Sequence, residues 1–242
     1  MIVHDAPQGT PEWHAARLGL PTASMAANLV TPTGRAAGAV VGYADRLGVQ
    51  RYRGLASDRF AGSPATGHGL LFEARARAAY AWLGDVDVLE VGFCTDDRAR
   101  YGGSPDGLIG EHGGLEIKCP LMPAFIAALM HIEERGTPPS PYLPQVHMLM
   151  LVTDRLWWDV AFWHPDLPDE PAVVRIERDR SWDRRLLRQI AVCRRRRDRV
   201  VATLARRAGR ERLVCRAEPA PTLSADGSAA PTRLNERCSV AG

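Results

Sequence analysis

The stretch from Ser104 to Pro120, SPDGLIGEHGGLEIKCP, constrains the fold more than any other part of the 242-residue chain. It carries Asp106 on a Pro-Asp-Gly turn, and glycines separate this turn from an alternating segment. The pattern predicts two short strands joined by a tight turn. Because side chains alternate along a strand, Glu116 and Lys118 share one face. Asp106, at the end of the neighbouring strand, can reach the same side.

Two carboxylates and an ammonium on one face of a sheet suit a hard divalent cation such as Mg²⁺. Lys118 is the only lysine in the chain, and every other one of the 31 Lys and Arg residues is arginine. An ammonium is a compact charge whose pKa can shift, whereas a guanidinium is forked and always charged. The single lysine therefore indicates a position where arginine would not serve. A surface hairpin with a chance Glu-Lys pair is the alternative interpretation.

A third carboxylate comes from the segment 67–83, which predicts a helix because Ala, Leu, Glu and Arg dominate it. Leu70, Glu73, Arg77 and Tyr80 fall roughly on one stripe of that helix. A glutamate on the inner side of a helix is costly unless it is paired or bound to metal. Glu73 is therefore a candidate metal ligand. An ion pair with Arg77, four residues later, is the alternative.

The N-terminal region predicts a phosphate site. Thr10 as cap and Pro11 as first helical residue predict a short helix to about Arg17. Thr22 or Ser24 can cap a second helix. A hydroxyl at a helix N-terminus, with an arginine a few residues upstream, makes a cradle for a phosphate. The alternative is an ordinary cap and a surface arginine.

The remaining pattern predicts an α/β fold in which a central mixed sheet is flanked by helices. A long arginine-rich helix is expected at 181–212, and its basic face either attracts nucleic-acid phosphates or is simply solvated. We expect one domain at 1–216 and a flexible tail at 217–242, where Ala, Pro, Ser, Thr and Gly dominate. Further helices are predicted at 40–55, 123–134 and 142–152, and strands at 86–91, 157–163 and 173–177.

Composition excludes several classes of protein. The five cysteines are scattered, and no C-x-x-C pair suggests a zinc ribbon or a disulfide framework. The sequence shows neither an apolar run long enough for a bilayer nor a signal peptide. We therefore expect a cytoplasmic protein with reduced thiols and no membrane partner.

Five motifs in a fixed order give the chain a resemblance to a known family. Between about residues 10 and 165 it resembles the PD-(D/E)XK nuclease core. It is most similar to the lambda-exonuclease or YqaJ-type phage recombination branch. The stretch 31–66 and the tail beyond 217 depart from the pattern. The motifs are Arg17 with Ser24 in RLGLPTAS, GxxxExxAR from Gly69 to Arg77, SPDGL, LEIKCP, and Tyr142 with Gln145.

The resemblance implies roles for the site residues. Lys118 would position an attacking water and stabilise charge in the transition state, and Gln145 would orient that water or Lys118. Mg²⁺ is the implied cofactor, and Mn²⁺ can substitute for it in such enzymes. The implied metal ligands are Glu73, Asp106, Glu116 and the carbonyl of Ile117.

Arg17, Ser24 and Ser104 match positions that hold the terminal 5′-phosphate of DNA in this family. Family members digest one strand of duplex DNA from its 5′ end and leave a 3′ single strand for an annealing protein. Close relatives form ring-shaped trimers. The implied function is a Mg-dependent 5′–3′ exonuclease acting on double-stranded DNA ends, in the host cytoplasm if the chain is phage-derived. The alternatives are an endonuclease or structure-specific nuclease on the same core, and a non-catalytic DNA-binding accessory protein.

Overall fold

A computed structural model describes residues 1–55, 64–167 and 170–215. Met1–Leu204 forms one compact unit, and the chain from Ala205 onward belongs to a second. The tail predicted at 217–242 lies outside the described residues, so its flexibility stays a prediction, as does the domain boundary at 216. Across the described residues, no helix combines the length and the apolar character that crossing a membrane requires.

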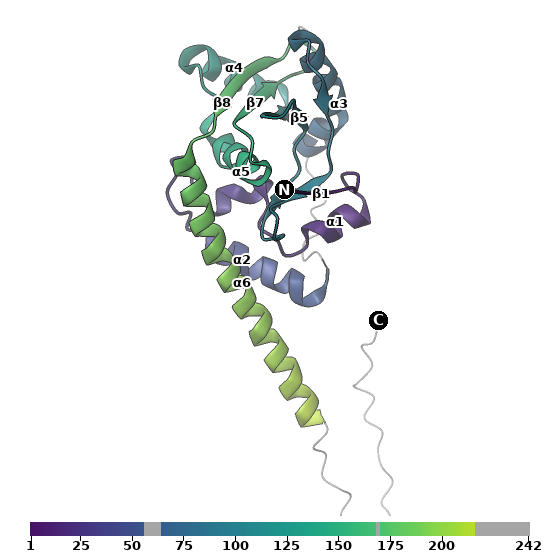
Figure 1. The fold of residues 1–242 in the computed structure, drawn as a ribbon, viewed down its shortest axis with the longest axis vertical. Helices are drawn as coiled ribbons and strands as arrows, with labels where there is room; N and C mark the ends of the chain where they lie inside the picture. The colour runs from purple at the N-terminus through teal and green to yellow at the C-terminus, as the bar shows by residue number, and fades with distance from the viewer. Residues whose placement is uncertain (56–63, 168–169, 216–242) are drawn as a thin grey trace, which may run out of the picture. The chain divides into compact units, whose positions relative to one another are not determined.

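A five-stranded mixed sheet lies at the centre of the first unit (Figure 1). Its order is β2-β5-β6-β7-β8, and every pairing is antiparallel except that of β6 with β7. The predicted fold class, a mixed sheet flanked by helices, is confirmed. The strands of this sheet are β2 (Val88–Leu89), β5 (Gly107–Ile109), β6 (Gly113–Lys118), β7 (Trp157–Phe162) and β8 (Ala172–Glu177).

A smaller antiparallel sheet, β1-β3-β4, joins distant parts of the chain. It consists of β1 (Ile2–His4), β3 (Phe93–Thr95) and β4 (Gly102–Gly103). The helices are α1 (Pro11–Arg17), α2 (Val40–Arg53), α3 (Pro64–Gly84), α4 (Met122–Arg135), α5 (Leu143–Thr153) and α6 (Arg180–Cys215), with 3₁₀ helices η1 (Ala23–Asn28) and η2 (Ser140–Tyr142).

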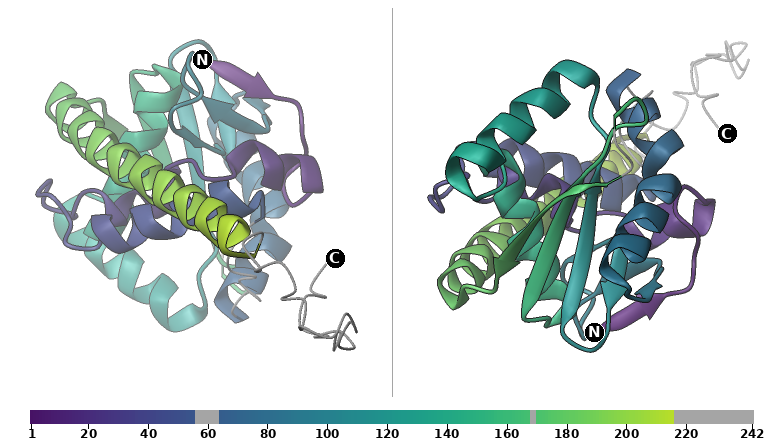
Figure 2. Two further views of the ribbon diagram at one scale, coloured as in Figure 1. Left: turned by 90° about the horizontal axis from the view of Figure 1, so that it is seen from below. Right: turned by 90° about the horizontal axis from the view of Figure 1, so that it is seen from above.

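Helices cover both faces of the central sheet (Figure 2). On one face, Ala76 and Tyr80 of α3 pack with Leu115 of β6 and with Trp163. On the other face, α5 packs against β7, and the core extends to Trp182 and other residues of α6. The alternation of β6 therefore sends Leu115 and Ile117 to the α3 side and leaves Glu116 on the opposite face, as the sequence predicted.

Two glycines of β6 make room for two tryptophans of β7. The parallel register places Gly113 beside Trp157 and Gly114 beside Trp158. A Cβ atom at Gly113 would lie 2.1 Å from the Trp157 ring, and one at Gly114 would lie 2.2 Å from the Trp158 ring. Any side chain here would push β7 away. These glycines therefore belong to the strand, and only Gly110, with φ of +48°, serves the turn before it.

Two predicted elements differ from the structure. The strand expected at 86–91 shrinks to Val88–Leu89 because its partner β5 offers only three residues for pairing. The second N-terminal helix is the 3₁₀ helix η1, and the Thr22 side chain does not cap it. Thr22 is buried instead, and its N–H donates to the hydroxyl of Tyr43 at 3.1 Å. Tertiary packing thus overrides the capping preference.

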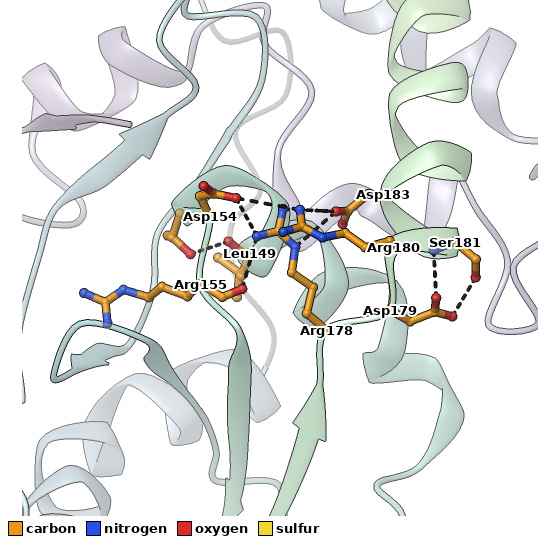
Figure 3. Close-up of polar contacts among 9 residues, drawn as sticks. Leu149, Asp154, Arg155, Arg178, Asp179, Arg180, Ser181 and Asp183 are labelled. Atoms are coloured by element: carbon orange, nitrogen blue, oxygen red, sulfur yellow. Dashed lines mark hydrogen bonds and ion pairs between the residues drawn. The ribbon is translucent and has the colours of Figure 1, made fainter.

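A charged cluster ties α5, β7, β8 and α6 together at one end of the sheet (Figure 3). The Arg178 side chain is 5% exposed and lies between two carboxylates. It is 2.6 Å from Asp154 and 3.0 Å from Asp183, and it also donates to the carbonyl of Arg155. Arg180 adds a second contact to Asp183 at 3.2 Å. The charges of Arg178, Asp154, Asp183 and Arg180 therefore each have an opposite charge beside them.

Candidate active site

A cleft of about 710 Å³ brings together the site residues that the sequence analysis singled out. Helices α1, α3 and α5, the segment before β5, and the end of β6 all contribute to its walls. Arg17 and Lys118, which are 101 positions apart in the chain, thus line one cleft. Its lining includes Arg17, Ser24, Glu73, Ser104, Asp106, Glu116, Ile117, Lys118 and Gln145.

The carboxylates and the ammonium meet at the C-terminal end of β6. An oxygen of Asp106 accepts the main-chain N–H of Ile117 at 2.6 Å, which locks the turn before β5 to the strand after it. Glu116 is 2% exposed, and its Oε1 atom accepts from both Lys118 Nζ and Gln145 Nε2. Lys118 Nζ also lies 3.4 Å from Gln145 Oε1. Gln145, from α5, therefore holds both ends of the Glu116–Lys118 pair.

Burial and mutual repulsion shift the protonation of this group. Burial, followed by the charges of Glu116 and Glu73, raises the pKa of Asp106 well above its ordinary value. Burial alone would lower the pKa of Lys118, but the Glu116 and Asp106 carboxylates outweigh it, and that pKa is raised. Lys118 is thus a stable ammonium at neutral pH. The site holds negative charge that its own cations do not fully balance.

Glu73 reaches the cleft from α3 and is paired with Arg77, so the ion pair expected as its alternative role exists. Arg77 contacts Glu73 Oε1 at 2.7 Å and Glu90 at 2.7 Å, and it donates to the main-chain carbonyl of Asp106 at 2.8 Å. Burial raises the pKa of Glu73, and Arg77 opposes that rise. Glu73 still lines the cleft, so pairing and a role at the site are compatible.

The donor set suits a hard cation in its chemistry. Carboxylate and carbonyl oxygens are the ligands that Mg²⁺ prefers, and Glu116 Oε2 is buried without a hydrogen-bond partner. Yet among the described residues no three His, Cys, Asp or Glu side chains form a ready-made metal cage. Arg77, Lys118 and the main chain of Ile117 hold the carboxylates instead. A divalent ion would fit the unsatisfied oxygen, provided that these side chains turn toward it.

The phosphate-type residues gather around Trp13 at another wall of the cleft. The Arg17 guanidinium stacks 3.8 Å above the Trp13 ring and lies 3.3 Å from the Ser24 hydroxyl. The Trp13 indole N–H donates to Ser104 at 3.0 Å. Burial lowers the pKa of Arg17 to about 10, so it remains a cation at neutral pH. Arg17 is thus half-buried against Trp13, and its role as a phosphate ligand stays a prediction.

Two features of the site were not predicted from the sequence: Trp13 in the cleft wall, and the contact of Arg77 with the main chain of Asp106. Trp13 precedes Arg17 by four residues on α1, a spacing that places both side chains on one helix face. That spacing was the available signal. The contact of Arg77 with the carbonyl of Asp106 joins residues 29 positions apart, so no local sequence pattern predicts it.

Comparison with known proteins decides the family. The model of the YqaJ-like viral recombinase domain matches residues 12–156. The chain belongs to this family. The match spans more than half of the chain and includes the nine candidate site residues of the cleft, so the lambda-exonuclease or YqaJ-type resemblance is confirmed. None of the curated proteins matches this YqaJ-like chain significantly.

Solved structures resemble the YqaJ-like chain over most of its length. An alkaline exonuclease from Laribacter hongkongensis, LHK-Exo, is 31% identical, with a TM-score of 0.73 over 83% of this chain and 99% of that one. The same enzyme in complex with dAMP is 32% identical, with a TM-score of 0.72 and the same coverage. A phage-related exonuclease from Haemophilus somnus 129PT shares the fold at 12% identity, with a TM-score of 0.57 over 79% and 94% of the two chains.

Proposed function

We propose that the protein is a Mg²⁺-dependent exonuclease that digests duplex DNA from its 5′ end and leaves a 3′ single strand. One observation carries the proposal: a single cleft holds both the Glu73–Asp106–Glu116–Lys118 group and the Arg17–Ser24–Ser104 group. The first group has the chemistry for phosphodiester hydrolysis, and the second has the chemistry for a terminal phosphate. An enzyme that needs both in one place acts at strand ends.

The relatives support this assignment. LHK-Exo, which is described as an alkaline exonuclease, aligns over 99% of its solved chain, so the similarity is not confined to one part of that enzyme. That enzyme has been solved with dAMP, a mononucleotide of the sort that stepwise digestion releases. We propose the same product class here. We further propose, from the family resemblance, a trimeric assembly and an annealing protein that receives the 3′ strand.

The residues of the cleft divide the chemical work. Lys118 stays protonated, so it donates hydrogen bonds and stabilises the negative charge that develops on the phosphate in the transition state. It cannot act as the general base in that form. Gln145 forms hydrogen bonds with both Lys118 and Glu116. These bonds hold the ammonium in its position, so it need not move during the reaction.

The acidic residues provide the ligands. Asp106, Glu116 and the Ile117 carbonyl would hold the Mg²⁺ ion, and Glu73 would hold this ion or a second one. When bound, the metal supplies Lewis-acid polarisation of the scissile phosphate and lowers the pKa of the attacking water. Burial, followed by the charges of Glu116 and Glu73, raises the pKa of Asp106, and a bound cation would offset that repulsion.

The end-recognition group would select the substrate. Arg17 offers a forked guanidinium that matches a phosphate, and Ser24 and Ser104 offer hydroxyl donors beside it. The Trp13 ring beneath Arg17 excludes water from one side of the guanidinium. A 5′-phosphate bound here would present the following phosphodiester to the carboxylate group.

The decisive experiment digests end-labelled linear duplex in the presence of Mg²⁺ and compares 5′-phosphate with 5′-hydroxyl ends. We expect release of mononucleotides from 5′-phosphorylated ends, with closed circles left intact. Arg17→Gln should erase the preference for phosphate, whereas Arg98→Gln, at an exposed arginine outside the cleft, should not. Nicking of circles would favour the endonuclease alternative. No Mg²⁺- or Mn²⁺-dependent cleavage of any DNA would favour the accessory protein.

A further inference from the structure

Helix α6 has one face in the core and an opposite face made of arginine. Its inner residues Trp182, Leu186, Ile190 and Cys193 are at most 8% exposed. Its outer face carries four exposed arginines, which we call the arginine face: Arg184, Arg188, Arg195 and Arg199.

The spacing of the arginine face is regular. At 3.6 residues per turn, the four positions fall within about 60° of one another around the helix axis. At 1.5 Å per residue they extend over about 22 Å, a length that faces about six phosphates of one DNA strand. Between Arg184 and Arg199 the only acidic residue is Asp198, which pairs with Arg197 at 2.8 Å. The face is therefore uniformly cationic.

Of the run of four arginines at 194–197, only Arg195 belongs to the arginine face. Arg196 forms a two-pronged pair with Asp45 of α2, at 2.6 and 3.0 Å. Arg197 is 3% exposed and donates to the carbonyl of Gly19 at 2.8 Å, behind the loop that follows Arg17. These two arginines hold α6 onto the unit. By contrast, the four guanidinium groups of the arginine face have no hydrogen bond or ion pair within the described ranges.

We infer that the arginine face is a second DNA-binding surface, which holds the phosphate backbone of duplex DNA outside the catalytic cleft. The inference rests on the proposed function for its choice of polyanion. Guanidinium groups match phosphates well, and such binding needs no particular base sequence. The cleft lining, as far as the structure describes it, contains no residue of α6.

Duplex DNA fits this surface better than a single strand does. Proteins that hold single strands combine basic grooves with aromatic side chains on which the bases stack. From Arg184 to Arg199 the helix contains no aromatic residue. The surface offers charge alone, which suits a duplex whose bases are already stacked inside. We therefore expect it to hold the undigested part of the substrate.

The test measures binding of the full chain to a dumbbell duplex that has no free ends, without divalent metal, across a range of salt concentrations. Each phosphate contact adds about 0.9 to the slope of log K against log salt. The quadruple variant R184Q/R188Q/R195Q/R199Q should lower that slope by up to about 3.6 and weaken binding by tenfold or more at low salt. The matching substitutions to lysine should retain most of both, because lysine keeps the charge.

A matched pair of double variants excludes a simple effect of net charge. R188Q/R195Q should lower the slope by about 1.8, whereas R98Q/R135Q, at exposed arginines outside α6, should leave it unchanged. Equal losses in both pairs, or no loss in the quadruple variant, would overturn the inference. So would a loss confined to single-stranded DNA. Because the probe has no ends and no metal is present, the result is independent of whether the protein proves to be an exonuclease.

Discussion

Two acidic clusters in the same compact unit are arranged in opposite ways. Around Arg178, the carboxylates of Asp154 and Asp183 each face a guanidinium (Figure 3). In the cleft, Asp106, Glu116 and Glu73 crowd together, and one buried oxygen of Glu116 has no partner. The first cluster is complete without a ligand, whereas the second is balanced only in part.

This difference distinguishes residues that stabilise the fold from residues that are arranged to bind a ligand. Buried charges that repel one another lower the stability of a protein, and they are found where function requires them. A cluster with matched charges gives no such signal. The partly unbalanced charge of the cleft therefore supports a functional role on energetic grounds, in addition to the family resemblance. A substitution in one cluster should leave the other cluster intact.

The largest effect is expected from Asp106→Asn. Catalysis should fall on the order of 10³-fold, because the substitution removes a carboxylate that we propose as a metal ligand. Metal-free stability should rise by about 1–2 kcal/mol at neutral pH. The pKa of Asp106 is raised in the folded state, so its ionisation costs stability as the pH rises above the unfolded value near 3.9. Asparagine removes that cost and can still accept from Ile117. Nuclease assays and metal-free thermal melts measure the two effects.

Arg178→Met should have the opposite effects: it should lower stability and leave activity nearly unchanged. Loss of the buried guanidinium leaves Asp183, at 10% exposure, with Arg180 alone, and should cost about 3 kcal/mol of unfolding free energy. Activity per folded molecule should stay within about twofold of wild type, since no residue of this cluster lines the cleft. Urea unfolding checks the first claim. A large loss of turnover at full folding would break the proposed separation.

Acidification should lower the free energy of unfolding through His147, a residue close to the Arg178 cluster. The buried imidazole stacks on Trp182 at 4.4 Å, and burial lowers the pKa of His147 from 6.5 to about 4. The unfolded chain takes up this proton near pH 6.5, but the folded chain resists it until about pH 4. Stability should therefore fall between these pH values, by up to about 3 kcal/mol.

His147→Phe keeps a ring against Trp182 and removes the titrating group. The difference in unfolding free energy between variant and wild type should change by up to about 3 kcal/mol from pH 7 to pH 4. Identical pH profiles for the two proteins would show that His147 protonates as easily in the folded state as in the unfolded one.

Sequence patterns predicted the local helices and the hairpin but not the pairing of strands that are far apart in the chain. The β5–β6 hairpin, α1 and α3 were predictable because their turn, cap and stop signals lie within a few residues of each other. The small sheet was not, because Ile2 pairs with Thr95 across more than ninety residues and neither segment has a distinctive pattern. The same limit applies to η1, where burial of Thr22 replaces capping.

The site was predictable in its residue types but not in its internal connections. The Asp106, Glu116 and Lys118 motifs follow from strand alternation and the family resemblance. The bonds from Trp13 to Ser104 and from Arg197 to Gly19 link residues 91 and 178 positions apart. Such contacts depend on how whole elements pack, so no pattern in a short window can contain them. Within the run at 194–197, Arg197 is buried and Arg196 pairs with Asp45 of α2, and neither contact can be read from the run itself.

The smallest expected effect tests whether Arg77 belongs to the cleft or only to the fold. Its guanidinium joins α3 to the Asp106 turn and holds one oxygen of Glu73, leaving the other oxygen available. Arg77→Lys keeps the charge but loses the fork that makes these contacts together. The Mg²⁺ concentration for half-maximal activity should rise by about tenfold. The Mg²⁺-induced rise in melting temperature should shrink in parallel.

Glu90→Gln provides the matched control. Glu90 is 69% exposed and shares Arg77 at 2.7 Å, so this change removes one partner of Arg77 without touching Glu73 or Asp106. If Arg77 positions the metal-binding carboxylates, Glu90→Gln should leave the Mg²⁺ dependence unchanged while Arg77→Lys shifts it. If both variants lose thermal stability equally and neither shifts the Mg²⁺ dependence, Arg77 belongs with Arg178, as a residue that matches charges to hold the fold.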